Sequence, residues 1–164
     1  MKDFNERKLI GIAVQHTKAT DKNSRIVDLM TKYLEKNFPE TRNDGYHLIQ
    51  VYPENFINGV SQEFITFLGV EKKRSLQLKQ PLLELYVPRS RGYHYLFEDA
   101  MTNDIDKKYE EIYEEFERNA IELHVNYDFE IWKKGRISMY FPIDSENILI
   151  PKAMSSEAFF QMIK

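Results

Sequence analysis

Short apolar runs and one helical repeat alternate through the first half of the chain. Residues 9–14 form an apolar run rich in β-branched side chains, which predicts a buried strand. Apolar residues then recur at helical spacing from 26 to 38, and Pro39 follows the end of this predicted helix. Two further segments, 46–52 and 63–70, have the composition of strands. The predicted order is therefore strand, helix, strand, strand.

The second half repeats this order after a charged connector. Residues 82–87 and 93–97 are predicted to be extended. Residues 104–123 carry the clearest helical periodicity of the chain, with one apolar face. Residues 127–132 and 136–142 then form a predicted hairpin. Because the element order repeats while the sequence does not, the duplication is predicted from the elements alone.

These elements divide the chain into one α+β unit with three parts. A first module covers about residues 5–75, a second module covers about 80–143, and residues 144–164 form a C-terminal extension. Within the extension, a short strand is predicted at 147–151, and Ser155 is predicted to cap a final helix. We expect residues 1–164 to form a single domain.

Composition excludes several classes of protein. The chain has no cysteine, so disulfides, thiolate zinc sites and cysteine nucleophiles are ruled out. The net charge of −3 argues against a nucleic-acid-binding surface. The four histidines lack metal-ligand spacing and there is no phosphate-binding glycine loop, so we expect neither a metal nor a cofactor. No apolar stretch reaches membrane-spanning length, and the chain is expected to be cytoplasmic.

Aromatic residues make up 13% of the chain, and some of them surround one carboxylate in the predicted hairpin. Strand alternation places Glu130 and Trp132 on one face. If Tyr140 of the paired strand shares that face, the three side chains converge. A carboxylate walled by aromatic rings attracts organic cations by charge and by cation–π contact. Spacing alone nevertheless favours an ordinary solvated role for Glu130, since glutamates are mostly exposed.

Other aromatic residues have a helical or strand spacing that is typical of core packing. Tyr109, Tyr113 and Phe116 lie on one face of the predicted helix. Of these, the two tyrosines are the candidates for a ligand role, because a buried hydroxyl needs a partner. Tyr93 shares a strand face with Tyr95 and is a further candidate for the lining of a groove. Weaker candidates in the first module are its residues at 46, 48, 50 and 52, which share one strand face.

An ordered set of motifs spans about residues 82 to 143. The chain has Leu-Tyr-Val-Pro at 85–88, a Tyr-containing strand at 93–97, Tyr-x-x-Ile-Tyr-x-x-Phe at 109–116, Phe-Glu-Ile-Trp at 129–132 and Tyr-Phe-Pro-Ile at 140–143. In order and spacing this set resembles the GyrI-like small-molecule-binding domain, also called the AraC-type effector-binding domain.

The resemblance implies a fold and a site. The fold would be two β-α-β-β modules related by a pseudo-two-fold axis, with an antiparallel sheet, two main helices and a groove between the modules. The groove would be lined by aromatic side chains around a carboxylate, and its implied ligand-binding residues are Glu130, Trp132, Tyr140, Tyr109, Tyr113 and Tyr93. In regulators this domain follows a helix-turn-helix, and the two modules leave no such segment here, so no direct contact with nucleic acid is expected. No membrane contact is expected either, because no apolar stretch reaches spanning length.

The function favoured by this reading is a stand-alone binding protein for an amphipathic or cationic small molecule. One alternative is a hydrolase of reactive electrophilic compounds on the same scaffold, which would need an acid or base beside the held substrate. Another is a protein-binding module resembling gyrase inhibitors, and a homodimer is also possible in principle. The sequence assigns no catalytic residue and leaves enzymatic activity undecided, with binding favoured.

Overall fold

The computed structural model describes residues 1–19, 25–42, 45–98, 102–133 and 135–164. Within them lie nine strands and four α-helices, together with the 3-10 helix η2 (Pro39–Thr41). The helices are α1 (Arg25–Asn37), α2 (Glu54–Ile57), α3 (Thr102–Arg118) and α4 (Ser156–Met162). The strands are β1 (Lys2–Phe4), β2 (Arg7–His16), β3 (Tyr46–Val51), β4 (Phe64–Glu71), β5 (Leu83–Val87), β6 (Ser90–Glu98), β7 (Tyr127–Lys133), β8 (Arg136–Ser145) and β9 (Met154–Ser155).

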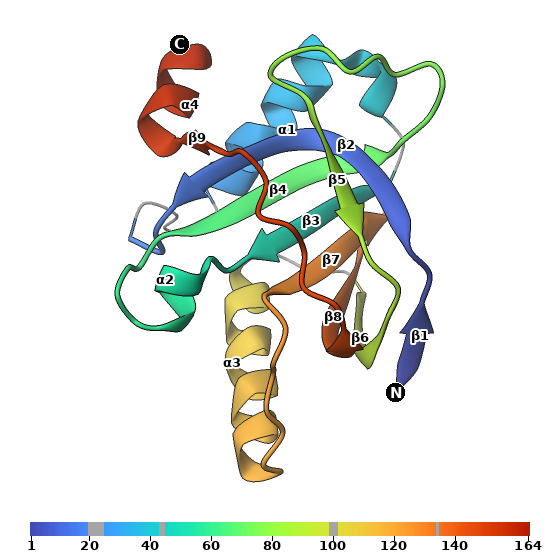
Figure 1. Cartoon of the computed structure of the whole chain (residues 1–164). Coiled ribbons are helices and arrows are strands. Elements are labelled where there is room, and N and C mark those ends of the chain that lie inside the picture. The colour runs from blue at the N-terminus through green and yellow to red at the C-terminus, as the bar shows by residue number, and fades with distance from the viewer. Residues whose placement is uncertain (20–24, 43–44, 99–101, 134) are drawn as a thin grey trace.

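All nine strands join one strongly curved sheet (Figure 1). Eight of them follow the order β1-β6-β8-β7-β3-β4-β2-β5, and β9 pairs with β2. Every pairing is antiparallel except the parallel contact between β9 and β2. The predicted α+β class is confirmed, with the correction that the sheet is mixed rather than purely antiparallel.

The repeated element order is visible in this topology. The units β2-α1-β3-β4 and β6-α3-β7-β8 arrange their strands in the same relative order, and they meet where β3 pairs with β7. Each unit also takes up the strand that precedes the other one, because β1 pairs with β6 and β5 pairs with β2. The sequence grouped residues 82–87 with the second module, whereas the hydrogen bonds of β5 join it to the first. Periodicity predicts that a segment is a strand, but it carries no information about which edge receives it.

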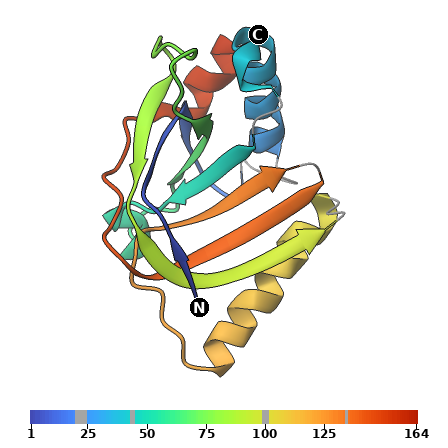
Figure 2. The ribbon, with the colours of Figure 1, turned by 90° about the vertical axis from the view of Figure 1, so that its right-hand side faces the viewer.

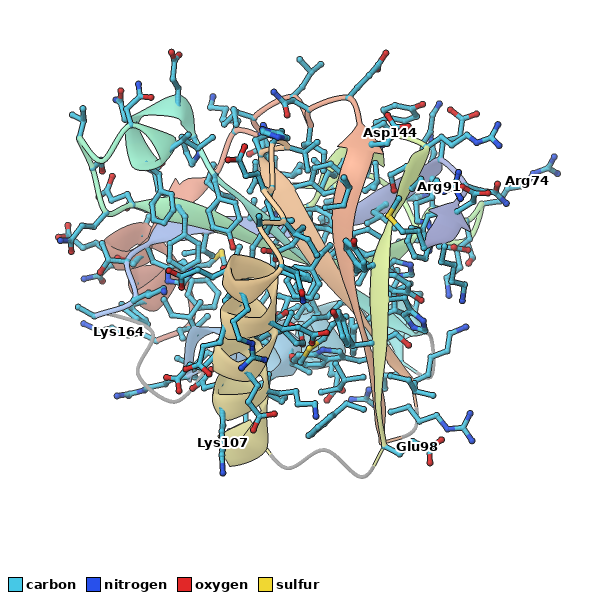
Figure 3. All side chains as sticks on the ribbon, turned by 90° about the horizontal axis from the view of Figure 1, so that it is seen from below. Arg74, Arg91, Glu98, Lys107, Asp144 and Lys164 are labelled. Carbon is cyan, nitrogen blue, oxygen red and sulfur yellow. The ribbon has the colours of Figure 1, made fainter. Side chains whose placement is uncertain are left out.

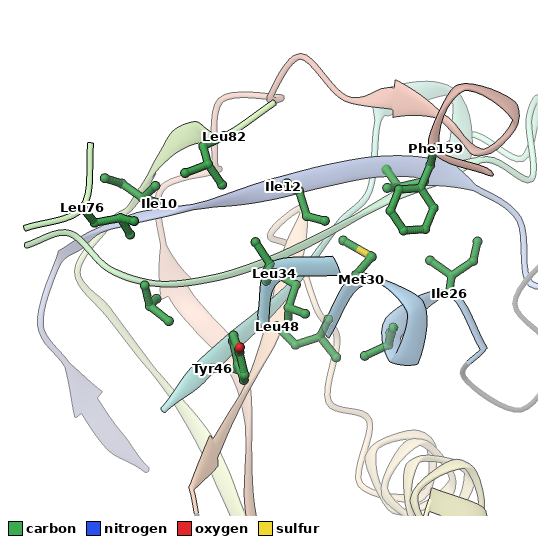
Figure 4. Packing of buried hydrophobic residues seen from close by; sticks show 14 residues of the cluster. Ile10, Ile12, Ile26, Met30, Leu34, Tyr46, Leu48, Leu76, Leu82 and Phe159 are labelled. Carbon is green, nitrogen blue, oxygen red and sulfur yellow. The ribbon is translucent and has the colours of Figure 1, made fainter. Parts of the chain in front are cut away.

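The helices α1 and α3 lie on the same side of the curved sheet (Figure 2). Alternate residues of each strand therefore face the helices, and the others face away. Ile10 and Ile12 of β2 pack with Met30 and Leu34 of α1, and Phe159 of α4 completes this cluster (Figure 4). Under α3 a separate cluster forms, built from Ile112 and Phe116 of the helix and from Ile137, Met139 and Phe141 of β8. A third cluster, which includes Leu9, Ile49, Phe67 and Phe129, covers the opposite face.

The largest boundary error concerns the end of α3, which was predicted at residue 123 and lies at Arg118. The helix closes with a Schellman-type arrangement. The amide of Ile121 donates to the carbonyl of Phe116 at 2.9 Å, that of Ala120 donates to Glu117 at 3.2 Å, and Ala120 has a φ of 53°. Glycine usually occupies this position. Because alanine occupies it here, the sequence carries no signal for the end of the helix.

The C-terminal extension differs from its prediction in one part and agrees in another. No strand forms at 147–151, because the backbone N–H and carbonyl of Ile148 are each bonded at 2.8 Å by the side chain of Asn126. The strand in this region is β9, which lies further along the chain. The predicted cap of the last helix is confirmed, since Ser155 Oγ accepts from the amide of Ala158 at 3.1 Å.

Candidate functional site

The pairing of β3 with β7 joins the two units at the centre of the sheet. On the helix-facing side, Leu48 lies opposite Glu130 and Gln50 lies opposite Asp128. Trp132, the next residue of β7 on this face, contacts both the core beneath α1 and the core beneath α3. Strand alternation therefore brings two carboxylates and an indole ring to the junction between the units.

Asp128 is held by two tyrosine hydroxyls from different elements. Tyr52, just after β3, donates to Oδ2 at 2.9 Å, and Tyr113 of α3 lies at 3.4 Å from the same oxygen. The side chain is only 5% exposed. Its second oxygen, Oδ1, is buried without a hydrogen-bond partner among the residues that the structure describes. An acceptor that is buried and unpaired favours the approach of a positively charged or hydrogen-bond-donating group.

Glu130 is equally buried, with an exposed fraction of 4%. The indole Nε1 of Trp132 donates to Oε1 at 3.3 Å, and the hydroxyl of Tyr109 provides a second hydrogen-bonding group. Tyr109 and Tyr113 stack side by side on α3, with ring centroids 6.1 Å apart. The face of α3 that was predicted to be aromatic thus lies over both carboxylates.

Burial controls the protonation of both acids. Loss of hydration raises the pKa of Asp128 to about 7, although hydrogen bonds from Tyr52 and Tyr113, and to a smaller extent the charge of Lys18, act in the opposite direction. Burial also raises the pKa of Glu130 to about 7, and hydrogen bonds from Tyr109 and Trp132 again oppose the rise. Near neutral pH each group is therefore present in both its protonated and its ionised form, and a bound cation would favour the ionised form.

A cleft of about 250 Å³ reaches Asp128 from the surface. Tyr52, Phe56 and Tyr113 line it beside the carboxylate, and Leu123 and Ile57 lie at its exposed side. The wall is therefore largely aromatic and aliphatic, with one acidic group. Such a combination suits an apolar ligand that carries a single positive charge.

One predicted member of the site lies on the wrong face of the sheet. Tyr140 is opposite Phe129, and the two rings stack with centroids 4.6 Å apart in the core on the side away from the helices. The residue of β8 beside Glu130 is Met139. The expected convergence of Tyr140 with Glu130 is therefore wrong, because the hairpin register differs by one residue from the alignment that the prediction required.

The structure separates Tyr93 from the carboxylates as well. It packs on Phe116 with ring centroids 5.3 Å apart, and β8 lies between its own strand and β7. Two weaker candidates of the first module, Tyr46 and Leu48, belong to the core beneath α1. The candidates that the structure does bring together with Glu130 are Trp132, Tyr109 and, through Asp128, Tyr113.

Sequence reasoning missed Asp128 and gave little weight to Tyr52. The signal for Asp128 was available, since residues 128, 130 and 132 alternate on one strand face. Tyr52 carried no such signal, because its role depends on the pairing of β3 with β7.

Two negative findings accompany the site. Among the described residues, no group of three or more His, Asp or Glu side chains could hold a metal ion. No helix in that part of the chain is long and apolar enough to cross a membrane.

Solved structures share this fold at low sequence identity. SAV2435, solved with tetraphenylphosphonium bound, superposes with a TM-score of 0.68 at 10% identity, covering 87% of this chain and 92% of its own. An integron cassette protein from the mobile metagenome of Vibrio cholerae gives 0.67 at 15% identity, covering 87% and 93%. EcmrR, solved in a complex with DNA, gives 0.54 at 11% identity, covering 87% of this chain and 56% of its own.

These similarities confirm the GyrI-like fold. No curated protein matches the chain by sequence. A family model does match, that of Cass2, the integron-associated effector binding proteins, and it covers residues 1–143. The chain therefore belongs to the Cass2 family of integron-associated effector binding proteins.

Proposed function

We propose that this protein binds a small organic cation at Asp128 and Glu130. The observation that carries the proposal is the pair of carboxylates on one face of β7, each no more than 5% exposed and without a basic side chain in the hydrogen bonds that hold it. Buried carboxylates are costly unless a positive charge compensates them. A cationic ligand would supply that charge.

The aromatic surroundings favour an organic cation over a hydrated metal ion. The rings of Tyr52, Phe56 and Tyr113 line the cleft beside Asp128, and aromatic rings attract a large cation through their quadrupoles. A metal ion would instead need several oxygen ligands in a closed geometry. The apolar wall of the adjacent cleft would bury the hydrocarbon part of the ligand.

A protein of the same fold has been solved with a ligand of this class. SAV2435, whose fold matches 87% of this chain, was solved with tetraphenylphosphonium, a lipophilic cation. At 10% identity the likeness carries the fold alone, so the ligand class for this chain rests on its own carboxylates and rings.

Titration calorimetry with tetraphenylphosphonium tests the proposal. Glu130→Gln and Asp128→Asn keep the shape of each side chain while removing its charge, and each should weaken binding about tenfold or more. Glu114→Gln removes an equal charge from the exposed side of α3 and should change the affinity less than about twofold. Equal affinities in all four proteins, or no binding by the unsubstituted chain, would contradict the proposal.

A second candidate function, hydrolysis of an electrophilic compound, is favoured by one observation. A carboxyl group whose pKa is about 7 has the acidity of a general acid or base at neutral pH, and Asp128 is oriented by the hydroxyls of Tyr52 and Tyr113. In this reaction Asp128 would accept a proton from water as the water oxygen attacks a carbon of the strained ring. The bond between that carbon and the ring heteroatom breaks, and the heteroatom takes up a proton returned by Asp128 or by solvent, so that the ring opens to the alcohol. Incubation with a strained-ring alkylating compound should then give the hydrolysed product, and Asp128→Asn should abolish turnover. An unaltered compound would exclude this activity for that substrate class.

A further inference from the structure

A second cleft, of about 290 Å³, lies on the face of the sheet away from the helices. Arg7 of β2, His47 of β3, Glu71 of β4 and Lys133 of β7 line it. Each lies an even number of positions from a core residue of its own strand, such as Leu9 for Arg7 and Phe129 for Lys133, and therefore points to the same face. Four strands therefore converge on a polar cleft at one end of the sheet.

The arginine of this cleft is oriented by a buried histidine. His47 is 4% exposed, and its Nδ1 lies 3.3 Å from the carbonyl of Gly45. That contact is a hydrogen bond if Nδ1 carries the proton, which leaves Nε2 as an acceptor for Arg7 Nη1 at 3.0 Å. Burial together with the nearby charges of Arg7 and Lys133 lowers the pKa of His47 to about 4, so the ring is neutral. A neutral His47 positions the guanidinium without adding to its charge.

Positive charge predominates around the cleft. Arg7 and Lys133 are joined at its edge by Lys72 and Lys73, against a single acid, Glu71. The two edge lysines already have partners, since Lys72 pairs with Glu84 at 3.2 Å and Lys73 donates to a backbone carbonyl at 2.8 Å.

The acid of the cleft neutralises it poorly. Glu71 is 65% exposed and lies 3.9 Å from Nη1 of the 20% exposed Arg7, so the acid is screened by solvent and the long contact contributes little. A guanidinium presents several donors in a planar fork that matches the oxygens of phosphate or carboxylate. Arg7 already donates from Nε to the carbonyl of Asn5 at 3.5 Å and from Nη1 to His47 at 3.0 Å. Its remaining N–H donors and the ammonium group of Lys133 match an anion that has several oxygens and more than one negative charge.

We propose that this cleft binds a small multivalent oxyanion through Arg7 and Lys133. The site is distinct from the cation site proposed above, because it lies on the opposite face of the sheet and has the opposite charge. Lys133 reaches it across Gly45, where an added Cβ would lie 2.9 Å from Lys133 Cε. The missing side chain of Gly45 thus makes room for the stem of the lysine.

Calorimetry with inorganic pyrophosphate at constant ionic strength tests this proposal, with citrate as a second probe that distinguishes phosphate from carboxylate. We expect saturable binding of at least one of them, weakened about tenfold by Arg7→Gln and several-fold by Lys133→Gln. Lys8→Gln is the matched control, since it removes the same charge from the neighbouring, exposed residue of β2, whose side chain points to the other face. This variant should change the affinity less than about twofold.

Two results would overturn the proposal: no saturable binding of either probe, or equal weakening by Lys8→Gln and Arg7→Gln. Because Arg7→Gln could disturb the packing around His47, the exposed Lys133 provides an independent variant, and a thermal unfolding curve of each protein reports its fold. Tetraphenylphosphonium binding should be the same in all of these variants, so the outcome here is separable from that of the cation site.

Discussion

The helices α1 and α3 occupy corresponding places on the sheet, yet they meet it through different chemistry. Beneath α1 the contacts are mainly aliphatic, and Ile26, Met30 and Leu34 have no exposed surface. Beneath α3 the helix presents tyrosines to two buried carboxylates, and Tyr113 remains 41% exposed. One half of a duplicated architecture thus provides a closed apolar core, while the other provides titratable groups that reach the surface.

The comparison shows that one topology can place a stabilising apolar core in one half and ionisable groups in the other. A closed aliphatic core gains free energy from burial alone, at about 25 cal/mol per Å². Buried carboxylates lose free energy unless they are protonated or paired. Charged side chains elsewhere on the second half, such as Lys107 and Glu98, project outward into solvent, as Figure 3 shows. The acids beneath α3 are therefore an exception within their own half of the molecule.

The largest expected effect comes from opening the closed half. Leu34→Ala would leave a cavity beneath α1 and should lower the free energy of unfolding by about 4 kcal/mol, measured by urea denaturation. The control Leu149→Ala, at a leucine that is 90% exposed, should change it by less than about 0.5 kcal/mol. The comparison also requires that Leu34→Ala leave the tetraphenylphosphonium affinity within about twofold. A large loss of affinity in a folded Leu34→Ala protein would show that the halves are not separable.

The next effect is a pH dependence of stability that belongs to the α3 half. Both acids have a pKa raised from below 5 to about 7, so the folded state holds protons that the unfolded state releases. The contribution of these bound protons to the free energy of unfolding is fully present below about pH 4 and is lost as the pH rises through about 7. For Glu130 this loss amounts to roughly 3 kcal/mol. The lowered pKa of His47 acts in the opposite direction over part of this range, so the contribution of the acids is the difference between each variant and the unsubstituted protein. In urea denaturation between about pH 4 and pH 8, Glu130→Gln and Asp128→Asn should each lose less stability, or gain more, than the unsubstituted protein as the pH rises. The slope of Leu34→Ala should equal that of the unsubstituted protein, and unchanged slopes in the two acid variants would contradict the assignment.

Ligand affinity should follow the same protons in the opposite direction. A cation binds the ionised carboxylates, and a group with a pKa of about 7 is about tenfold more ionised at pH 8 than at pH 6. Tetraphenylphosphonium should thus bind about tenfold more tightly at pH 8, with proton release that calorimetry in two buffers would detect. Glu130→Gln should reduce this dependence. Affinity that falls as the pH rises would be inconsistent with a carboxylate as the binding group.

The smallest effect concerns the hydroxyl that holds Asp128. Tyr52→Phe removes a donor at 2.9 Å, which should cost about 1 kcal/mol of stability and raise the pKa of Asp128 further, since the ionised form loses a hydrogen bond. A titration of the Asp128 carboxyl carbon by NMR would measure the shift. Tyr33→Phe removes a hydroxyl from α1 and should leave that titration unchanged. A lowered pKa in Tyr52→Phe would contradict the hydrogen bond as described.

Much of the fold could be read from the sequence because it depends on local pattern. Apolar runs and helical periodicity located β2, α1, β3, β4, β6, α3, β7 and β8, and an N-cap at Ser155 located the final helix. Elements without such a pattern escaped, among them the three-residue strand β1 and the four-residue helix α2. Their formation depends on neighbours that only the folded chain supplies.

The candidate site shows the same limit residue by residue. Alternation placed Glu130 and Trp132 on one face, and the motif order identified the GyrI-like fold to which that face belongs. Tyr140 was misplaced because a hairpin of known strands can pair in either register, and the sequence does not say which residue opposes Glu130.

What the sequence determined by itself is most of the strands and helices, the aromatic face of α3 and the shared face of Glu130 and Trp132 on β7, because these follow from spacing along one element. The tertiary structure alone decided that Tyr52 reaches Asp128 across 76 positions of chain, that β1 and β5 exchange partners, and that Arg7 meets His47 behind the sheet. Those contacts join separate elements, and their geometry depends on strand register and sheet curvature. Burial, which raises the pKa of both acids, likewise arises only when the elements pack together.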